Sequence, residues 1–172
     1  MTGAIIYTSE DEFDADYKEA LYADAKEIVK ERKWWNEPLS FFEDADEPDL
    51  LTGATKLIHR QLKDDLGNLR SVDYRDDMLM GMADYLRIIE ILTYYSKEHE
   101  FAWFLSYPAS PQDKEIGRIV DGEIDPQIFD FLIHEMEALN IKDEDLENES
   151  LQETIRAKYF NPSGKPIFRG NQ

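Results

Sequence analysis

The chain contains no cysteine. This absence excludes disulfide bonds, thiolate zinc sites and a cysteine nucleophile. Charged residues interrupt the apolar stretches every few positions, so we expect no membrane-spanning segment. The first residues lack the basic region of a secretory signal peptide. The sequence therefore predicts a cytoplasmic protein.

Motifs for catalysis and for cofactor binding are absent as well. The sequence has no Gly-rich phosphate loop, no Gly-x-Ser-x-Gly nucleophile elbow and no dinucleotide-binding fingerprint. None of the three histidines, His59, His99 and His134, has the second histidine four residues away that a zinc-binding helix requires. We therefore expect no cofactor, and a binding protein rather than an enzyme.

Negative charge is what the chain has in excess. It carries 38 Asp and Glu against 19 Lys and Arg, a net charge of −19. Such a surface repels nucleic acid and anionic membranes and attracts basic proteins. Two stretches, residues 56–75 and 156–169, are basic, and we expect them to pair with acidic runs of this chain or of a second copy. The sequence thus predicts a basic protein partner and leaves a homodimer open.

Apolar residues recur mostly at helical spacing, which predicts a mainly α fold. The pair Ser9 and Glu12 has the spacing of a capping box, and Asp49 is placed to cap a second helix. The helix expected from residue 73 is apolar nearly all round, which is typical of a buried central helix. The predicted helices cover residues 9–33, 49–66, 73–99, 125–140 and 150–160.

Shorter segments complete the predicted fold. Residues 4–7 indicate a short strand, and an Asp121-Gly122 turn indicates a small β-hairpin near residues 115–124. Residues 101–107 fit either a helix or a strand. We expect a single acidic domain over residues 1–172, a bundle of about five helices around a buried central helix, with a basic, flexible tail over residues 161–172.

Two acidic runs are candidates for a partner-binding surface. The first follows a proline-containing segment with four large aromatic residues, and aromatics bordered by charge are typical of interface hot spots. The alternative is that both runs are solvated loops and helix starts, and that the rings fold back over the core. The candidate residues are Trp34, Trp35, Phe41, Phe42, Glu43, Asp44, Asp46, Glu47, Asp49, Asp143, Glu144, Asp145 and Glu147.

We favour an inhibitor of the immunity-protein or antitoxin type, which masks the basic functional surface of a toxin, often a nuclease, or of a nucleic-acid-binding protein. A DNA-mimicking inhibitor is one alternative. A second is a Mg²⁺- or Mn²⁺-dependent nucleotide hydrolase, because Asp73, Asp77 and Asp84 lie near one face of the long helix and hard cations prefer oxygen ligands. A third is a structural or adaptor protein whose charge maintains solubility.

Overall fold

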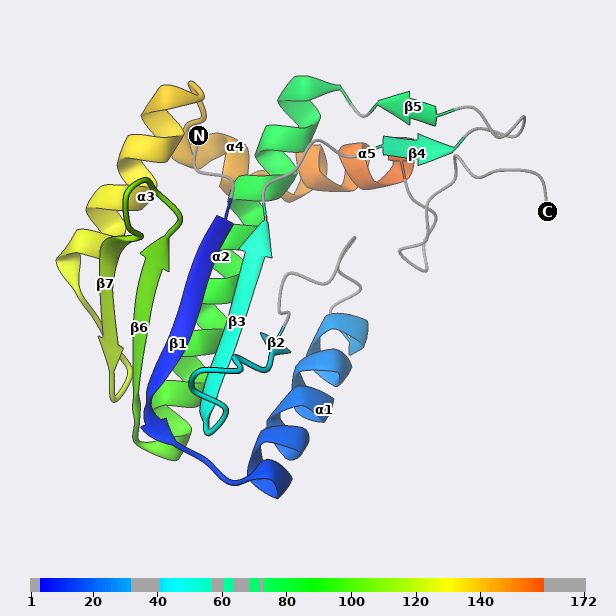
Figure 1. Cartoon of the computed structure of the whole chain (residues 1–172). Helices are drawn as coiled ribbons and strands as arrows, with labels where there is room; N and C mark the ends of the chain where they lie inside the picture. Colours follow the sequence, from blue (N-terminus) through cyan, green and yellow to red (C-terminus); the bar gives the residue numbers. More distant parts are fainter. Residues whose placement is uncertain (1–3, 32–40, 57–60, 64–68, 72, 160–172) are drawn as a thin grey trace.

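The computed structural model describes residues 4–31, 41–56, 61–63, 69–71 and 73–159 (Figure 1). Strands outnumber helices in this part of the chain. In chain order the elements are β1 (Ala4–Glu12), α1 (Ala15–Glu31), β2 (Phe41–Phe42), β3 (Leu50–Lys56), β4 (Gln61–Lys63), β5 (Leu69–Ser71), α2 (Tyr74–His99), β6 (Ala102–Tyr107), β7 (Lys114–Val120), β8 (Glu123–Ile124), α3 (Pro126–Ala138), α4 (Asp143–Glu147) and α5 (Glu149–Tyr159).

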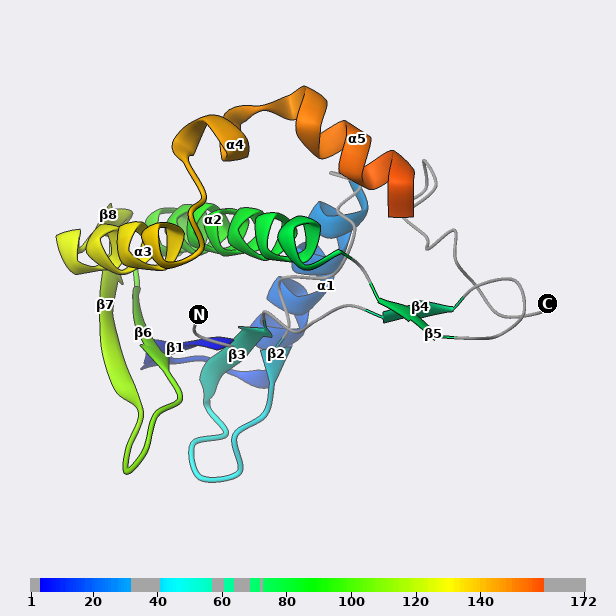
Figure 2. The same cartoon turned by 90° about the horizontal axis from the view of Figure 1, so that it is seen from above.

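The fold is α+β, and the predicted mainly α bundle is wrong. Six strands form one antiparallel sheet in the order β2-β3-β1-β6-β7-β8, and β4 and β5 form a separate pair. The helix α2 runs along one face of the sheet, with α3 beside it, and α4 and α5 lie on the far side of α2 (Figures 1 and 2). No helix in the described ranges covers the opposite face of the sheet, and none of them is long and apolar enough to cross a bilayer.

The core lies between α2 and the inner face of the sheet. Its largest fully buried side chains come from α2 and from the central strands, and each contributes about 1.5–3 kcal/mol relative to exposure in water. The indole N–H of Trp103 on β6 donates to the carbonyl oxygen of Leu92 on α2, at 3.0 Å. The helix predicted from residue 73 to residue 99, with a buried central position, is therefore confirmed.

Polar contacts attach α1 to α2. The buried hydroxyl of Tyr95 on α2 donates to Oδ2 of Asp24 on α1, at 2.8 Å. Burial raises the pKa of Tyr95 well above its ordinary value, and the hydrogen bond to Asp24 raises it further. The phenol therefore stays protonated and keeps donating. Near the start of α1, the Tyr17 hydroxyl hydrogen-bonds with Nδ1 of His99.

The predicted start of the first helix is wrong because residues 4–12 pair with neighbours on both sides as β1. Ser9 is buried in that strand, where its Oγ accepts the backbone N–H of Leu51 at 2.9 Å and donates to the carbonyl oxygen of Asp11 at 2.8 Å. The residue that caps α1 is Asp14, whose Oδ1 accepts the backbone N–H of Tyr17 at 2.8 Å. Serine is a common helix-capping residue, but here its side chain hydrogen-bonds backbone groups of two neighbouring strands.

The predicted helix over residues 49–66 is wrong as well. Residues 50–56 are β3, which pairs with β1 and β2. Leu51 points into the core, and the next residue, Thr52, lies on the other face of the sheet opposite Thr8, where it is buried as well. Because β-sheet preference depends on cross-strand neighbours, these pairings outweigh the local helical spacing.

The remaining predicted segments are largely confirmed. Within residues 101–107, which fit either a helix or a strand, residues 102–107 form the strand β6. The Asp121-Gly122 turn joins β7 to β8, and both residues have positive φ. The helix α3 begins at Pro126, as the Asp125-Pro126 pair predicts. A helix also begins near Ser150, although the side chain that caps it is Asn148.

An engineered disulfide tests the corrected fold, since no native cysteine competes for the new thiols. Thr8 and Thr52 face each other in the β1–β3 register, and facing Cβ atoms are roughly 4.5–5.5 Å apart, close to what a disulfide needs. Within the described residues the Thr52 hydroxyl has no hydrogen-bond partner, so Thr52→Cys loses no bond. We expect the Thr8→Cys/Thr52→Cys variant to crosslink under mild oxidation, as measured by thiol titration.

The matched control is Thr8→Cys/Lys56→Cys. Lys56 lies four residues along β3 from Thr52, roughly 13 Å away, so this pair should stay reduced. Equal crosslinking of the two variants, or crosslinking of neither, would contradict the assigned register.

Candidate protein-binding surface

The end of β1 and the start of β3 bring two acidic segments together. Glu12 is paired with Leu50 in the sheet, and the backbone N–H of Phe13 donates to the carbonyl oxygen of Asp49 at 2.8 Å. The Nζ of Lys18 on α1 also donates to the carbonyl oxygen of Pro48. The β1–α1 junction and the loop between β2 and β3 therefore lie side by side at one end of the sheet (Figure 1).

We name residues 10–16 and 43–49 the acidic end. It holds ten carboxylates and no lysine or arginine. All of them are exposed except Asp44, which is half-buried and accepts the backbone N–H of Asp46 at 2.9 Å. Like charges this dense create an attractive field for a basic partner. The carboxylates are Glu10, Asp11, Glu12, Asp14, Asp16, Glu43, Asp44, Asp46, Glu47 and Asp49.

Two basic side chains next to the acidic end bind groups of this chain. Lys18 is only 8% exposed and holds the Pro48 carbonyl. Arg118 on β7 forms an ion pair with Glu10, with 2.7 Å between Nη2 and Oε2, and this carboxylate raises the pKa of Arg118. The pair occupies one carboxylate of the ten and leaves most of the negative charge of the acidic end facing solvent.

The two aromatic residues of β2 point to opposite faces of the sheet. Phe41 turns inward, and the centroid of its ring lies 5.7 Å from that of Tyr7 and 4.9 Å from that of Tyr22. Phe42 is 46% exposed beside the acidic end and pairs in register with Thr52. Of these two rings, only Phe42 is exposed, as the predicted hot-spot arrangement requires. Trp34 and Trp35 lie outside the described residues.

The second acidic run forms α4, at the opposite end of the molecule from the acidic end in both views (Figures 1 and 2). Asp145 accepts the backbone N–H of Lys142 at 3.0 Å and forms an ion pair with Arg75 at 3.1 Å. Arg75 also donates to the carbonyl oxygens of Leu139 and Asn140. The two runs therefore do not form one surface, and Asp145 holds α4 in place. The other candidates here, Asp143, Glu144 and Glu147, are exposed.

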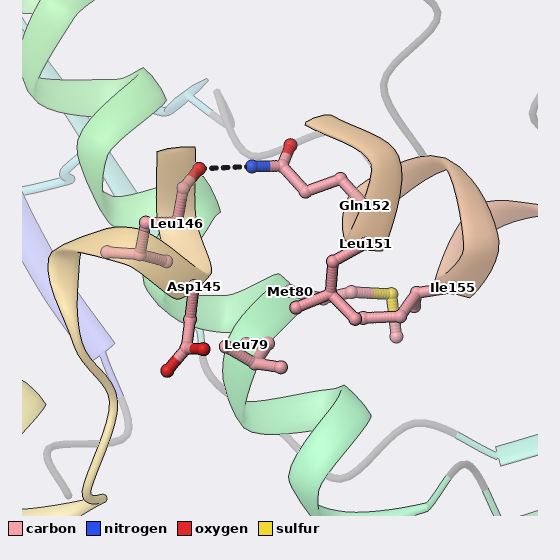
Figure 3. A pocket seen from close by; sticks show the side chains of 7 residues that line it. All are labelled: Leu79, Met80, Asp145, Leu146, Leu151, Gln152 and Ile155. Carbon is pink, nitrogen blue, oxygen red and sulfur yellow. Dashed lines mark hydrogen bonds between the residues drawn. The ribbon is translucent and has the colours of Figure 1, made fainter. Parts of the chain in front are cut away.

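Apolar side chains pack α4 and α5 onto α2. Figure 3 shows Leu79 and Met80 of α2 facing Leu151 and Ile155 of α5, with Gln152 hydrogen-bonded to the carbonyl oxygen of the α4 residue Leu146. The space left between these side chains is about 10 Å³, enough for roughly one water molecule. This contact is structural and has no room for a ligand.

The three aspartates of the alternative metal site differ in environment. Asp73 is exposed, whereas Asp77 and Asp84 are buried, and Asp84 forms an ion pair with Arg87 at 3.3 Å. In the described ranges no group of three or more histidine, aspartate or glutamate residues is placed to hold a metal ion. The nearby Asp76 accepts hydrogen bonds from the hydroxyl of Tyr159 and from Lys158.

The sequence did not identify residues 10–14 as part of the acidic end. The sequence interpretation treats residues 10–14 as a helix start, where negative charge complements the helix dipole. The period-two alternation of β1, in which Ile5, Tyr7 and Ser9 are buried between more exposed neighbours, indicates the strand but ends at Ser9. The strand then continues through three exposed acids to Glu12, whose pairing with Leu50 places these acids beside the β2–β3 loop.

No protein-family model matches the chain, and neither a curated protein nor a solved structure is significantly similar to it.

Mutual repulsion in the acidic end predicts a salt-dependent gain in stability when its charge is removed. We expect Glu43→Gln/Asp46→Asn/Glu47→Gln to raise the free energy of unfolding by about 0.5–1 kcal/mol at low salt. The gain should shrink in 0.5 M NaCl, where screening shortens the range of the repulsion. Thermal unfolding followed by circular dichroism at both salt concentrations measures the effect.

The matched control removes three carboxylates from α4, as Asp143→Asn/Glu144→Gln/Glu147→Gln. This variant should gain less stability, because two of its three carboxylates, Asp143 and Glu144, lie in the first turn of α4, where negative charge complements the helix dipole. Equal gains in the two triple variants would show that only net charge matters.

Proposed function

We propose that this chain is an acidic inhibitor that binds a basic protein and masks its functional surface, as immunity proteins and antitoxins do. The observation that supports the proposal is the acidic end, where two segments far apart in the sequence place ten carboxylates at one end of the sheet. The partner is a cationic toxin, such as a nuclease, or another nucleic-acid-binding protein. A cytoplasmic location is part of the proposal.

The contact combines charge at the rim with an apolar anchor. Phe42 is exposed at the border of the acidic end, and buried aromatic anchors supply much of the binding energy in protein interfaces. The surrounding carboxylates accelerate the encounter with a basic surface, and this acceleration weakens as salt screens the field. The binding residues proposed are Phe42, Glu43, Asp44, Asp46, Glu47 and Asp49, joined by the acids of residues 10–16.

The location of the charge favours the immunity type over a DNA mimic. A mimic requires rows of carboxylates along an elongated surface, at spacings that resemble phosphates. Here the largest group gathers at one end, and the α4 acids lie at the other end with Asp145 committed to Arg75. A localised patch beside an exposed aromatic ring is what a single basic partner fits.

Affinity capture with matched variants tests the proposal. The wild-type chain, the acidic-end triple variant (Glu43→Gln/Asp46→Asn/Glu47→Gln) and the α4 triple variant are immobilised and exposed to lysate of the source cells at low salt. We expect mass spectrometry to find a basic protein on the wild type and on the α4 variant, depleted at least tenfold on the acidic-end variant.

The variant Phe42→Ala separates the contribution of the aromatic anchor to affinity from that of the carboxylates to the association rate. It should weaken binding of the captured protein by about 10- to 100-fold without changing the salt dependence of association. Equal capture by all variants, or capture of acidic rather than basic proteins, would reject the proposed inhibitor.

A further inference from the structure

The face of the sheet that points away from α2 carries no helix of the described ranges, and Figure 1 views the sheet from this side. The register between β3, β1 and β6 places seven side chains of these central strands on this face. None of them is charged, although 33% of the residues in the chain are. We name these seven residues the outer strip. They are Ile6, Thr8, Thr52, Ala54, Ala102, Phe104 and Ser106.

This composition differs from that of an ordinary solvated sheet face. An antiparallel sheet with one face in water commonly alternates apolar residues inside with polar residues outside. Three members of the outer strip are buried, but Ile6, Ala54 and Phe104 are apolar and keep part of their surface in solvent. Apolar surface without charge is typical of the centre of a protein interface, where charged residues are depleted. The outer strip therefore has the composition of a docking surface.

The outer strip adjoins the proposed binding residues on two sides. On one side, Thr52 pairs in register with Phe42 of β2, the exposed aromatic anchor. On the other side, Phe104 lies opposite Arg118 of β7, whose guanidinium forms the ion pair with Glu10 of the acidic end. The strip and the acidic end thus combine an apolar centre with a charged border, as protein interfaces do.

The charge and the width of this surface indicate its occupant. A second copy of the chain has the same net charge of −19 and the same acidic end beside its strip, so it is repelled, whereas a basic partner is attracted. Adjacent strands lie about 4.8 Å apart, so the strip is roughly 10 Å wide from β3 to β6. This width is close to the diameter of an α-helix, about 10–12 Å.

We propose that the outer strip binds an amphipathic helix of the basic partner. The apolar stripe of that helix packs on Ile6, Thr8 and Phe104, beside the Phe42 ring, while its lysine and arginine residues face the acidic end. The inference rests on the proposed function, because the acidic end is what selects a basic partner. It adds the kind of segment that this partner presents.

Titration with a model helix tests the strip without the natural partner. The probe is a peptide with two copies of the heptad Leu-Lys-Lys-Leu-Leu-Lys-Leu, which has one apolar face as a helix. We expect saturable amide shifts in NMR on β1, β3 and β6. The affinity should be about tenfold higher than that of a peptide with the same composition in an order that gives no apolar face.

Charges placed in the strip separate burial from attraction. If the complex removes water from the strip, Thr8→Glu and Thr8→Lys should both weaken peptide binding by about tenfold, because either charge is desolvated. If attraction alone acts, Thr8→Glu should bind the peptide more tightly. The matched controls Gln127→Glu and Gln127→Lys change an exposed residue of α3 and should alter the affinity by less than about twofold.

A cysteine variant gives the same test if a charged variant fails to fold. Because the chain has no native cysteine, Thr8→Cys places a single thiol in the strip. The peptide should slow alkylation of this thiol and leave alkylation of Gln127→Cys unchanged.

Equal binding of the two peptides, shifts confined to the acidic end, or tighter binding by Thr8→Glu would overturn the inference. That result would leave the proposed inhibitor standing, because capture at the acidic end does not require a helix on the sheet. Failure to capture a basic protein, in turn, would reject the inhibitor without altering the result with the peptides.

Discussion

The structure depends on burying α2, a helix that is apolar nearly all round. Leaving its large side chains in water would cost about 1.5–3 kcal/mol for each one, so other elements must cover it on several sides. The sheet covers one side, where Trp103 packs and donates its N–H to the Leu92 carbonyl. The helix α1 attaches through the Tyr95–Asp24 hydrogen bond, and α4 and α5 cover the far side (Figure 2).

This burial also determines where the charge lies. An unpaired carboxylate is costly to bury, and the acids of residues 10–16 and 43–49 lie on an exposed junction and an exposed loop. Because β1 and β3 are antiparallel, the junction that follows β1 and the loop that precedes β3 meet at the same end of the sheet. The acidic end is therefore a consequence of one strand pairing, reinforced by the Phe13–Asp49 backbone hydrogen bond. The field that would attract a basic partner is built by the fold.

Local patterns predict the elements that depend on local interactions. The central helix and α3, with its Asp125-Pro126 start, follow from apolar periodicity and from capping chemistry. Residues 4–7 are predicted as a strand, but the rest of β1 and all of β3 depend on partners about 45 residues away, so local pattern makes Ser9 a candidate helix cap. For the candidate surface, the sequence predicts both acidic runs, whereas the structure places residues 43–49 beside residues 10–16 and the α4 run at the opposite end of the molecule.

The association rate with the captured basic protein tests the central claim most directly. Stopped-flow measurements from 20 to 500 mM NaCl would compare the wild type with the two triple variants, which remove equal charge from the acidic end and from α4. We predict that the logarithm of the rate falls steeply with ionic strength for the wild type and the α4 variant, and that the acidic-end variant has a clearly shallower slope. Equal slopes for the two triple variants would show that net charge, rather than the acidic end, steers the encounter, and would contradict the account.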